Sequence, residues 1–326
     1  MGRGARGRGM NVSLSSATSC FRSYAGYDNC LELRNDETRL ILGPHCGGRV
    51  LSYQFRGREA LYLDPAQNGW IQGPDSPEMS ALGPTGGRAD VGPESDQPPR
   101  PTLWLGPWDL EAGDDGSAEM TSRRCPDTGL RVQRRFELEG DTSRVRFTQT
   151  LRNEGSQPAR VCHWGRTFGR GGGICVIPLK GKRSYDYIRF DPGGIATHPP
   201  DPAIRVREGC VEVLGPPLHA KLGFDTKAEW FAVAQPSDLL FVKRYSVPGQ
   251  AEYGDSGGMT VSIYIKDDRL CELEPIGPMH TLSPGEEASF IENWELLPFA
   301  FPSKGENLDL GALKNCVDPT NSKRWN

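Results

Sequence analysis

The sequence predicts an all-β protein that folds as one large antiparallel sandwich. Its 326 residues include 40 Gly and 27 Pro, a composition typical of many short strands joined by turns. Apolar and polar residues alternate in 31–34 and 38–42, and the polar segment 35–37 between them is a hairpin signal. Helical periodicity is nearly absent. Because all-β sandwiches often run past roughly 200 residues as one domain, we expect a single domain.

Strand patterns continue along most of the chain. Further strands are expected at 49–55, 119–122, 130–139, 144–152, 159–164, 211–213, 229–234, 239–245, 259–265, 269–274 and 288–296. The segment 64–102 is rich in Pro, Gly, Asp and Ser, and we interpret it as a long loop with a functional role. Residues 1–20 are predicted to be a disordered tail, 21–302 the β domain, and 303–326 a C-terminal tail that wraps around it.

The composition argues against several classes of protein. A net charge of -4 disfavours a nucleic-acid partner, because phosphate binding relies on clustered Lys and Arg. No apolar run approaches the roughly 20 residues of a membrane span, so no membrane partner is expected. The Gly/Arg-rich beginning lacks the apolar core of a secretory signal. The nine Cys form no CxxC pair, which indicates free thiols in a reducing cytoplasm. We expect a monomer or a homodimer.

Motifs for metal binding and for serine hydrolysis are missing from the sequence. The five His are far apart, at His45, His163, His198, His219 and His280, and none has the spacing of a zinc site. No GxSxG nucleophile motif is present. The sequence therefore predicts neither a metal nor a cofactor.

Two segments carry a family resemblance. The first, 153–168, is a polar turn with Asn153 and Pro158 that enters a strand containing Cys162-His163-Trp164. The second runs from Leu-Glu-Pro at 273–275 through Leu-Ser-Pro-Gly-Glu at 282–286 to the strand around 290–294. Both segments, together with 40–55, resemble the aldose 1-epimerase (galactose mutarotase) superfamily. The resemblance spans roughly residues 24–301. It implies a galactose mutarotase-like antiparallel β-supersandwich with its site on the concave face of the larger sheet.

The resemblance also implies an acid-base pair. His163 matches the general acid of the family by position, and Glu274 matches its general base. Such a pair removes the proton of the anomeric hydroxyl and protonates the ring oxygen as the sugar ring opens. Members usually have a second histidine before the catalytic one, but here no histidine lies between His45 and His163. The chain is therefore expected to be a divergent member.

Strand alternation allows a check on this pair. Glu272 and Glu274 share one face of their strand, and Val161 and His163 share a face opposite Trp164. Both candidate groups can then point away from the core into a polar cleft. The plainer alternatives are a solvated sheet face for the two Glu and a hydrogen-bonded structural role for His163.

Several other side chains are predicted to hold a sugar. Trp108 and Trp164 are candidate stacking platforms, or else core residues. Arg166, in a Gly-rich segment, is a candidate for binding a carboxylate or sulfate, or else a solvated Arg at a sheet edge. The remaining predicted sugar-binding residues are Arg49, Arg88, Lys221, Asp225 and Glu292, of which Lys221 and Asp225 are equally consistent with a solvated turn.

Three functions follow from these observations. The first is an epimerase-like enzyme that uses acid-base chemistry at or next to the anomeric carbon of a mono- or oligosaccharide. The second is a lyase or hydrolase acting on an acidic sugar, with an Arg that stabilises the developing charge. The third is a carbohydrate-binding protein without catalysis, because a fold does not dictate chemistry.

Overall fold

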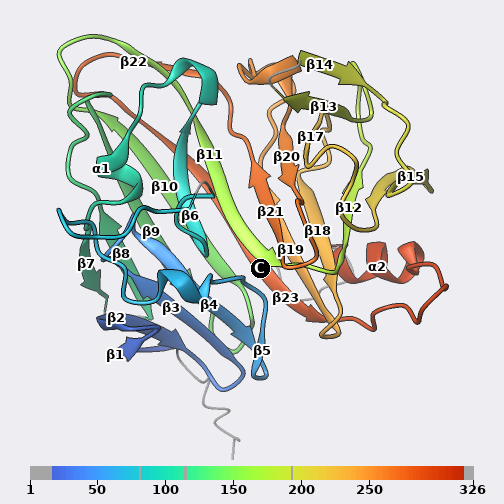
Figure 1. The fold of residues 1–326 in the computed structure, drawn as a ribbon, viewed down its shortest axis with the longest axis horizontal. Coiled ribbons are helices and arrows are strands. Elements are labelled where there is room, and N and C mark those ends of the chain that lie inside the picture. Colours follow the sequence, from blue (N-terminus) through green and yellow to red (C-terminus); the bar gives the residue numbers. More distant parts are fainter. Residues whose placement is uncertain (1–16, 81, 114–115, 192–193, 319–326) are drawn as a thin grey trace, which may run out of the picture.

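Two antiparallel β-sheets lie face to face and form the body of the molecule (Figure 1). The structure is a computed structural model that describes residues 17–80, 82–113, 116–191 and 194–318. We call the 13-stranded sheet A and the 10-stranded sheet B. The predicted all-β class with two packed antiparallel sheets is confirmed.

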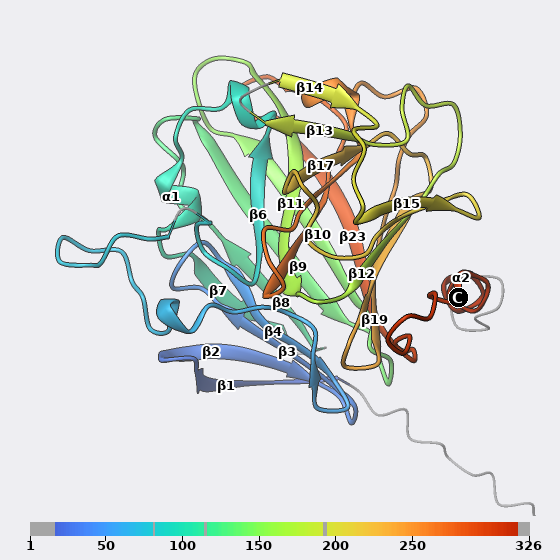
Figure 2. The same cartoon turned by 45° about the vertical axis from the view of Figure 1, so that its right-hand side comes forward.

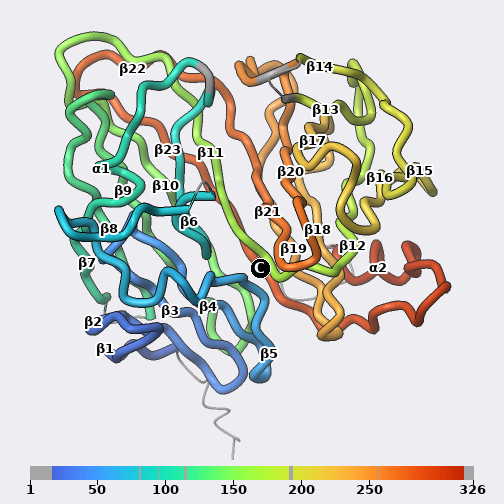
Figure 3. Tube along the Cα trace, viewed as in Figure 1, coloured from blue at the N-terminus to red at the C-terminus, as the bar shows by residue number. Residues whose placement is uncertain are grey.

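Sheet A carries the face on which the candidate site lies. Its strands, in spatial order, are β1 (Thr18–Tyr24), β2 (Tyr27–Arg34), β3 (Thr38–Gly43), β4 (Arg49–Phe55), β6 (Gly87–Gly92), β11 (Ala159–Arg170), β21 (Leu270–Pro275), β20 (Val261–Tyr264), β17 (Lys221–Phe224), β13 (Ile188–Asp191) and β14 (Gly194–Thr197). Two short strands extend it: β5 (Arg58–Glu59) pairs with β4, and β22 (His280–Leu282) pairs with the beginning of β11 (Figure 3).

Sheet B packs against the inner face of sheet A. Its strands, in spatial order, are β15 (Ile204–Arg207), β16 (Cys210–Val213), β12 (Ile174–Pro178), β18 (Trp230–Gln235), β19 (Leu239–Tyr245), β23 (Glu287–Pro298), β10 (Val145–Asn153), β9 (Leu130–Leu138), β8 (Ser117–Thr121) and β7 (Asp109–Ala112). The helical segments are η1 (Pro65–Gln67), η2 (Glu94–Asp96), α1 (Pro101–Trp104), η3 (Ser256–Gly258) and α2 (Leu310–Val317).

The main hydrophobic core fills the space between the two sheets. In β9, Leu130, Val132, Phe136 and Leu138 point inward at every second position, as the pleat of a strand requires. Arg134 interrupts this row, and its buried guanidinium donates hydrogen bonds to the backbone carbonyls of Gly48 and Gly87. Each large apolar side chain that is fully buried stabilises the fold by about 1.5–3 kcal/mol.

The segment 64–102 differs from the predicted loop. Its central part, 87–92, is strand β6, which pairs with β4 and β11 inside sheet A. The alternation of Arg88 and Asp90 with Ala89 and Val91 spans only four positions between Gly87 and Gly92, so the Pro- and Gly-rich composition around it suggested a loop.

The two ends of the chain extend the β domain. Most of the predicted N-terminal tail lies outside the described residues, but 18–20 belong to β1, so the predicted tail extended too far. The prediction failed there because β1 is an edge strand with mostly exposed side chains and no apolar alternation. At the other end, α2 lies outside sheet B, where Leu310, Leu313 and Val317 pack on β12, β18 and β19 (Figure 2). Residues 319–326 lie outside the described residues.

Candidate functional site

Three neighbouring strands of sheet A direct charged side chains to its outer face. The pairing of β6 with β11 places Arg88 opposite Arg166, and Asp90 opposite Trp164. Residues directly opposite each other in an antiparallel pair point to the same face. Strand β21 adds Glu272 and Glu274, which alternate with the inward-facing Cys271 and Leu273. We call Arg88, Asp90, Arg166, Lys221, Glu272 and Glu274 the cleft cluster.

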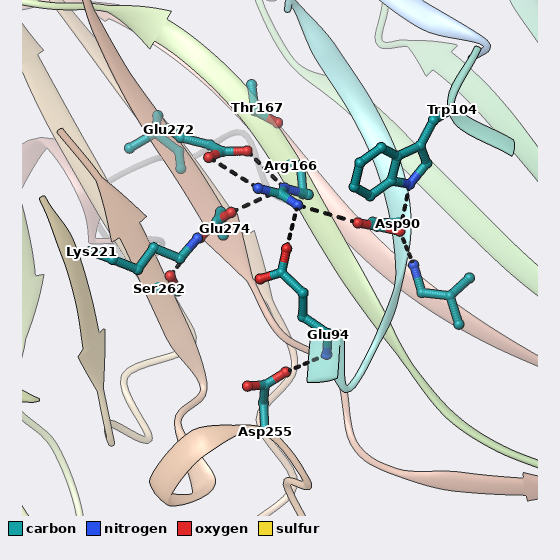
Figure 4. Close-up of polar contacts among 12 residues, drawn as sticks. Asp90, Glu94, Trp104, Arg166, Thr167, Lys221, Asp255, Ser262, Glu272 and Glu274 are labelled. Atoms are coloured by element: carbon teal, nitrogen blue, oxygen red, sulfur yellow. Dashed lines mark hydrogen bonds and ion pairs between the residues drawn. The ribbon is translucent and has the colours of Figure 1, made fainter. Parts of the chain in front are cut away.

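Arg166 lies at the centre of the cleft cluster (Figure 4). Its Nε donates to Oε1 of Glu272 at 2.8 Å and lies 3.2 Å from Oε1 of Glu274. Its Nη1 lies 3.4 Å from Oδ2 of Asp90 and 3.1 Å from Oε1 of Glu94. Since the Arg166 side chain is only 10% exposed, these four carboxylates replace the water that a guanidinium would otherwise need.

Neighbouring strands hold the carboxylates of this cluster in place. Glu274 accepts hydrogen bonds from Nζ of Lys221 on β17 and from the hydroxyl of Ser262 on β20. Asp90 accepts from Nε of Arg100 at 2.6 Å and from Nε1 of Trp104 at 2.8 Å. Glu274 and Asp90 therefore each have partners from at least two segments of the chain.

The two adjacent carboxyl groups of β21 have opposite pKa shifts. Burial alone raises the pKa of Glu272, but Arg166, Lys221 and Arg88 outweigh it and lower that pKa to about 2. Burial and the Glu272 carboxylate raise the pKa of Glu274 above its usual value, against the opposing effects of Lys221 and Arg166. Two carboxyl groups this close thus differ in how readily they accept a proton, as acid-base sites require.

Arg88 is the cation of the cluster with unpaired donors. Its side chain is buried, and its guanidinium stacks over the Trp104 ring with Cζ 4.2 Å from the ring centroid. Nε and Nη1 of Arg88 have no hydrogen-bond partner among the described residues. Burial and the nearby Arg166 lower the pKa of Arg88 to about 10, although Asp90 and Glu272 oppose the shift.

A cavity of about 820 Å³ opens beside this cluster. It is large enough for a monosaccharide or a short oligosaccharide. Its wall combines basic, acidic and aromatic side chains: Ser80, Leu82, Arg88, Glu94, Trp104, Arg166, Phe190, Leu218, His219, Ala220, Lys221, Tyr264, Lys266, Asp267, Arg269, Leu270 and Glu272. Five of these are Arg or Lys and three are Asp or Glu, so the wall has an excess of positive charge.

Comparisons with solved structures identify the fold. The chain is similar to the Slr1438 protein from Synechocystis sp. PCC 6803, with 16% identity and a TM-score of 0.57 over 85% of this chain and 98% of that one. It is also similar to a putative aldose 1-epimerase from Escherichia coli K12, with 13% identity and a TM-score of 0.55 over 87% and 100% of the two chains. The chain has the galactose mutarotase-like fold.

A third similar structure is a galactose mutarotase-like protein from Lactobacillus casei ATCC 334, at 11% identity and a TM-score of 0.57 over 82% of this chain and 100% of that one. No protein-family model matches the chain, and no curated protein gives a significant match. Because the sequence identities are only 11–16%, these comparisons establish the fold and nothing finer.

The predicted pair of His163 and Glu274 is not brought together within this fold. His163 is 2% exposed and lies on the inner face of β11, where it stacks on Phe290 of sheet B at a centroid distance of 5.7 Å. Burial lowers the pKa of His163 to about 3, with a smaller contribution from His280. The outer face of β11 carries Trp164 and Arg166 instead. The sequence argument did place His163 opposite Trp164, but it assigned the wrong one of these two faces to the cleft.

Two other predicted sugar-binding residues also belong to the core. Glu292 on β23 is buried between the sheets, where it accepts hydrogen bonds from Gln149 and Trp294 and pairs with Lys243. Trp108 is buried in the main core, and its Nε1 donates to the carbonyl of Leu103. Both predictions are corrected, because each side chain faces the inside of the sandwich.

Arg49 and Asp225 have structural partners away from the cavity. Arg49 donates to the side chain of Gln67, the carbonyl of Thr85 and the hydroxyl of Tyr27, so it anchors the long 64–86 segment. Asp225 accepts from the backbone N–H of Ser184. Neither residue lines the cavity, and their predicted contacts with sugar are corrected accordingly.

The remaining predicted residues lie in or under the cleft. Arg88, Arg166 and Lys221 line the cavity. Trp164 is buried directly below them, with Nζ of Lys221 5.5 Å and Cζ of Arg166 5.8 Å from its ring centroid. Trp164 therefore supports the two cations from beneath, in cation-π contact.

Sequence reasoning missed several residues of this site. Asp90 and Glu94 come from the segment 64–102 interpreted as a loop, and Phe190, Tyr264 and Lys266 line the cavity from other strands and turns. The alternation of Arg88 and Asp90 was the available signal for β6. No local pattern marks Phe190, Tyr264 and Lys266.

Two further searches gave negative results within the described part of the chain. No group of three or more His, Cys, Asp or Glu side chains in the described ranges could hold a metal ion. Likewise, no helix among those residues has the length and apolar character needed to cross a membrane.

Proposed function

We propose that this protein binds a mono- or oligosaccharide bearing an acidic group in the cavity beside the cleft cluster. The observation that carries the proposal is the buried guanidinium of Arg88, which has two nitrogens without a partner next to an 820 Å³ cavity. A buried cation with unused donors is costly unless an anion pairs with it. A carboxylate, sulfate or phosphate on the sugar supplies that anion in a charge-assisted pair.

The rest of the cavity wall suits a sugar ring. Phe190 and Tyr264 provide apolar surface for the faces of the ring, while Lys221, Asp267 and Arg269 offer donors and acceptors for hydroxyl groups. A few polar groups on a mixed apolar wall are typical of sites that orient a small polar ligand.

Binding without ring-opening catalysis is favoured by the state of Glu274. Its carboxyl group is completely buried, and Lys221, Ser262 and Arg166 surround it. A general base must reach the proton that it removes, at about 2.6–3.2 Å. Here Lys221 and Arg166 lie between Glu274 and the cavity, and His163 lies on the other side of the sheet.

Isothermal titration calorimetry over a sugar panel tests the proposal. We expect glucuronate, galacturonate and glucose 6-phosphate to bind, and their neutral parents to bind at least about 10-fold more weakly, because each charge-assisted contact contributes about 1.5–3 kcal/mol. Arg88→Met should remove the preference for acidic sugars. Arg146→Met is the matched control, since Arg146 lies on sheet B outside this cavity. Equal binding of acidic and neutral sugars, or no binding of any, contradicts the proposal.

An epimerase-like activity is the second candidate, and the raised pKa of Glu274 favours it. In this case a sugar displaces Lys221, and Glu274 then takes the proton of the anomeric hydroxyl. The bond between the anomeric carbon and the ring oxygen breaks, and a cation of the cluster stabilises the negative charge that the ring oxygen gains. Polarimetry of freshly dissolved acidic sugars, with wild type and Glu274→Gln, tests this. Faster mutarotation that Glu274→Gln abolishes supports catalysis, and an unchanged rate leaves binding alone.

A further inference from the structure

Two cysteines from opposite sheets meet behind the cleft cluster. Cys175 on β12 of sheet B and Cys271 on β21 of sheet A both point into the main core. Their Sγ atoms lie 3.1 Å apart, although 96 positions separate the two residues in the chain. Cys175 is completely buried and Cys271 is 3% exposed.

The pair is distinct from the other cysteines of the described chain. Cys30, Cys46, Cys125, Cys162 and Cys210 are also buried. Cys125 packs in the main hydrophobic core. Cys30 and Cys46 have backbone carbonyls as the nearest acceptors of their thiols, while Cys162 and Cys210 pack in separate hydrophobic clusters. The short contact therefore singles out one pair, which joins the two sheets.

We propose that Cys175 and Cys271 form a site of reversible disulfide formation that links sheet A to sheet B directly behind the carboxylates of the cleft. The separation of the two sulfurs must shorten by about 1 Å to reach the bond length of about 2.05 Å. Because the gap is only about 1 Å, a small shift of β12 toward β21 brings the two sulfurs to bonding distance.

The reaction balances with a peroxide as the oxidant. One thiolate attacks the peroxide and becomes a sulfenic acid as the first water leaves; the second thiol then attacks that sulfur and releases the second water. The two thiols lose two electrons and two protons in total, and the peroxide is reduced to two waters. A dithiol reverses the reaction through exchange.

Access to the pair is limited, so the reaction is slow. Burial and the adjacent Cys175 raise the pKa of Cys271 well above the ordinary value, which keeps that thiol protonated at neutral pH. The three consecutive glycines Gly171–Gly173 lead into β12, and Gly172 adopts a positive φ of 73°. Gly172 is exposed and lies three positions before Cys175 in the chain.

The linkage has a structural consequence for the site. Strand β21 carries Glu272 and Glu274 on its outer face and Cys271 on its inner face. A bond at Cys271 fixes the strand from behind, so the carboxylates are held to sheet B as well as to their partners in sheet A. A crosslink between residues about 100 positions apart also removes entropy from the unfolded chain.

The experiment compares oxidised and reduced protein by mass spectrometry and melting. The background variant has Cys20→Ser and Cys316→Ser, which removes the two exposed cysteines. After long incubation of the folded protein with hydrogen peroxide and alkylation, we expect a digest peptide that joins Cys175 to Cys271. The melting temperature should rise by about 5–15 °C, and dithiothreitol should reverse both changes.

Matched variants separate the pair from general oxidation. Cys175→Ser and Cys271→Ser should each abolish the linked peptide and the rise in melting temperature. Cys210→Ser removes an equally buried thiol elsewhere and should leave both intact. The proposal is overturned if Cys175 and Cys271 are recovered as separate peptides, if the link forms only after denaturation, or if the linked protein melts at a lower temperature.

Discussion

Two buried clusters of charged side chains lie on opposite faces of sheet A, and they differ in how completely their cations are paired. The inter-sheet cluster consists of Gln149, Thr167, Lys243, Glu292 and Trp294. In it, Nζ of Lys243 reaches Oγ1 of Thr167 at 2.9 Å, the carbonyl of Leu273 at 3.1 Å and Oε2 of Glu292 at 3.0 Å. An ammonium group has three donors, so this cation is saturated.

The cleft cluster contains a cation with hydrogen-bond donors that have no partner. Arg166 is surrounded by carboxylates, but Nε and Nη1 of Arg88 have no partner among the described residues. A buried cation whose donors are all paired helps to hold the two sheets in register and has no donor free for a ligand. A buried cation with unpaired donors at the wall of a cavity can still pair with an anionic ligand. A buried cation with unpaired donors, rather than buried charge itself, therefore distinguishes the candidate site from the structural cluster.

The largest effect should come from removing the saturated cation. Lys243→Met leaves the Glu292 carboxylate buried without its counter-ion, which typically costs about 3–5 kcal/mol of unfolding free energy. Urea unfolding followed by tryptophan fluorescence measures it. The double variant with Glu292→Leu should recover part of the loss, because no charge then remains unpaired. A loss below about 1 kcal/mol for Lys243→Met would erase the distinction between the clusters.

His163 on the inner face should give the next largest effect, through pH. The pKa of His163 is about 3 in the folded protein and about 6.5 when unfolded, so the unfolded state binds the extra proton between these values. Stability is then complete above about pH 6.5 and falls as the pH decreases, by as much as about 3 kcal/mol at pH 4.

Unfolding of wild type and His163→Gln over this pH range isolates the contribution of His163 to stability. In His163→Gln, the unfolding free energy should fall less steeply as the pH decreases, and the variant should still bind the same sugars. If the slopes of the two proteins are equal, His163 is charged or solvated in the fold. If sugar binding disappears while the protein stays folded, His163 reaches the cleft after all.

The cleft cation should respond differently to the same type of change. Arg88→Met removes a desolvated guanidinium without leaving a hydrogen-bonded partner unpaired, so the unfolding free energy should change by less than about 1 kcal/mol. Residues that bind a ligand often contribute nothing to the stability of the fold. The comparison with Lys243→Met uses the same urea measurement. A loss of about 3 kcal/mol or more would show that Arg88 is structural.

The sequence predicted the fold better than the site, for a physical reason. Strands such as β9 and β10 have one inner face of apolar residues, and period-two alternation shows it directly. The match of 153–168 and 272–294 then indicated which all-β fold to expect. In β6, the alternation of charged and apolar residues spans only four positions and a glycine lies at each end, so the composition of the segment suggested a loop.

The site required knowledge of which face of a strand is the outer one. In β11, alternation groups His163 with Thr167 and Trp164 with Arg166, but both faces are buried. The pattern of a doubly buried strand cannot say which set faces the cleft. Pairing with β6 and β21 decides it, because Arg166 lies opposite Arg88 and beside Glu274. Those long-range contacts are absent from any local window of sequence.

The smallest expected effect concerns Glu94, an exposed residue beside the cleft cluster. Its side chain is 44% exposed, and its carboxylate lies 3.1 Å from Nη1 of Arg166 at the cavity wall. An ion pair in which one partner is this exposed contributes about 0–1 kcal/mol, so Glu94→Gln should leave stability nearly unchanged. The same carboxylate competes with an acidic ligand for the cations, so its loss should strengthen binding of acidic sugars by about 2–5-fold.

Calorimetry with Glu252→Gln as the control measures this, since Glu252 pairs with Arg160 outside the cavity. Weaker binding by Glu94→Gln would instead make Glu94 an acceptor for sugar hydroxyls, and the incomplete pairing of the cleft cluster would then be limited to Arg88.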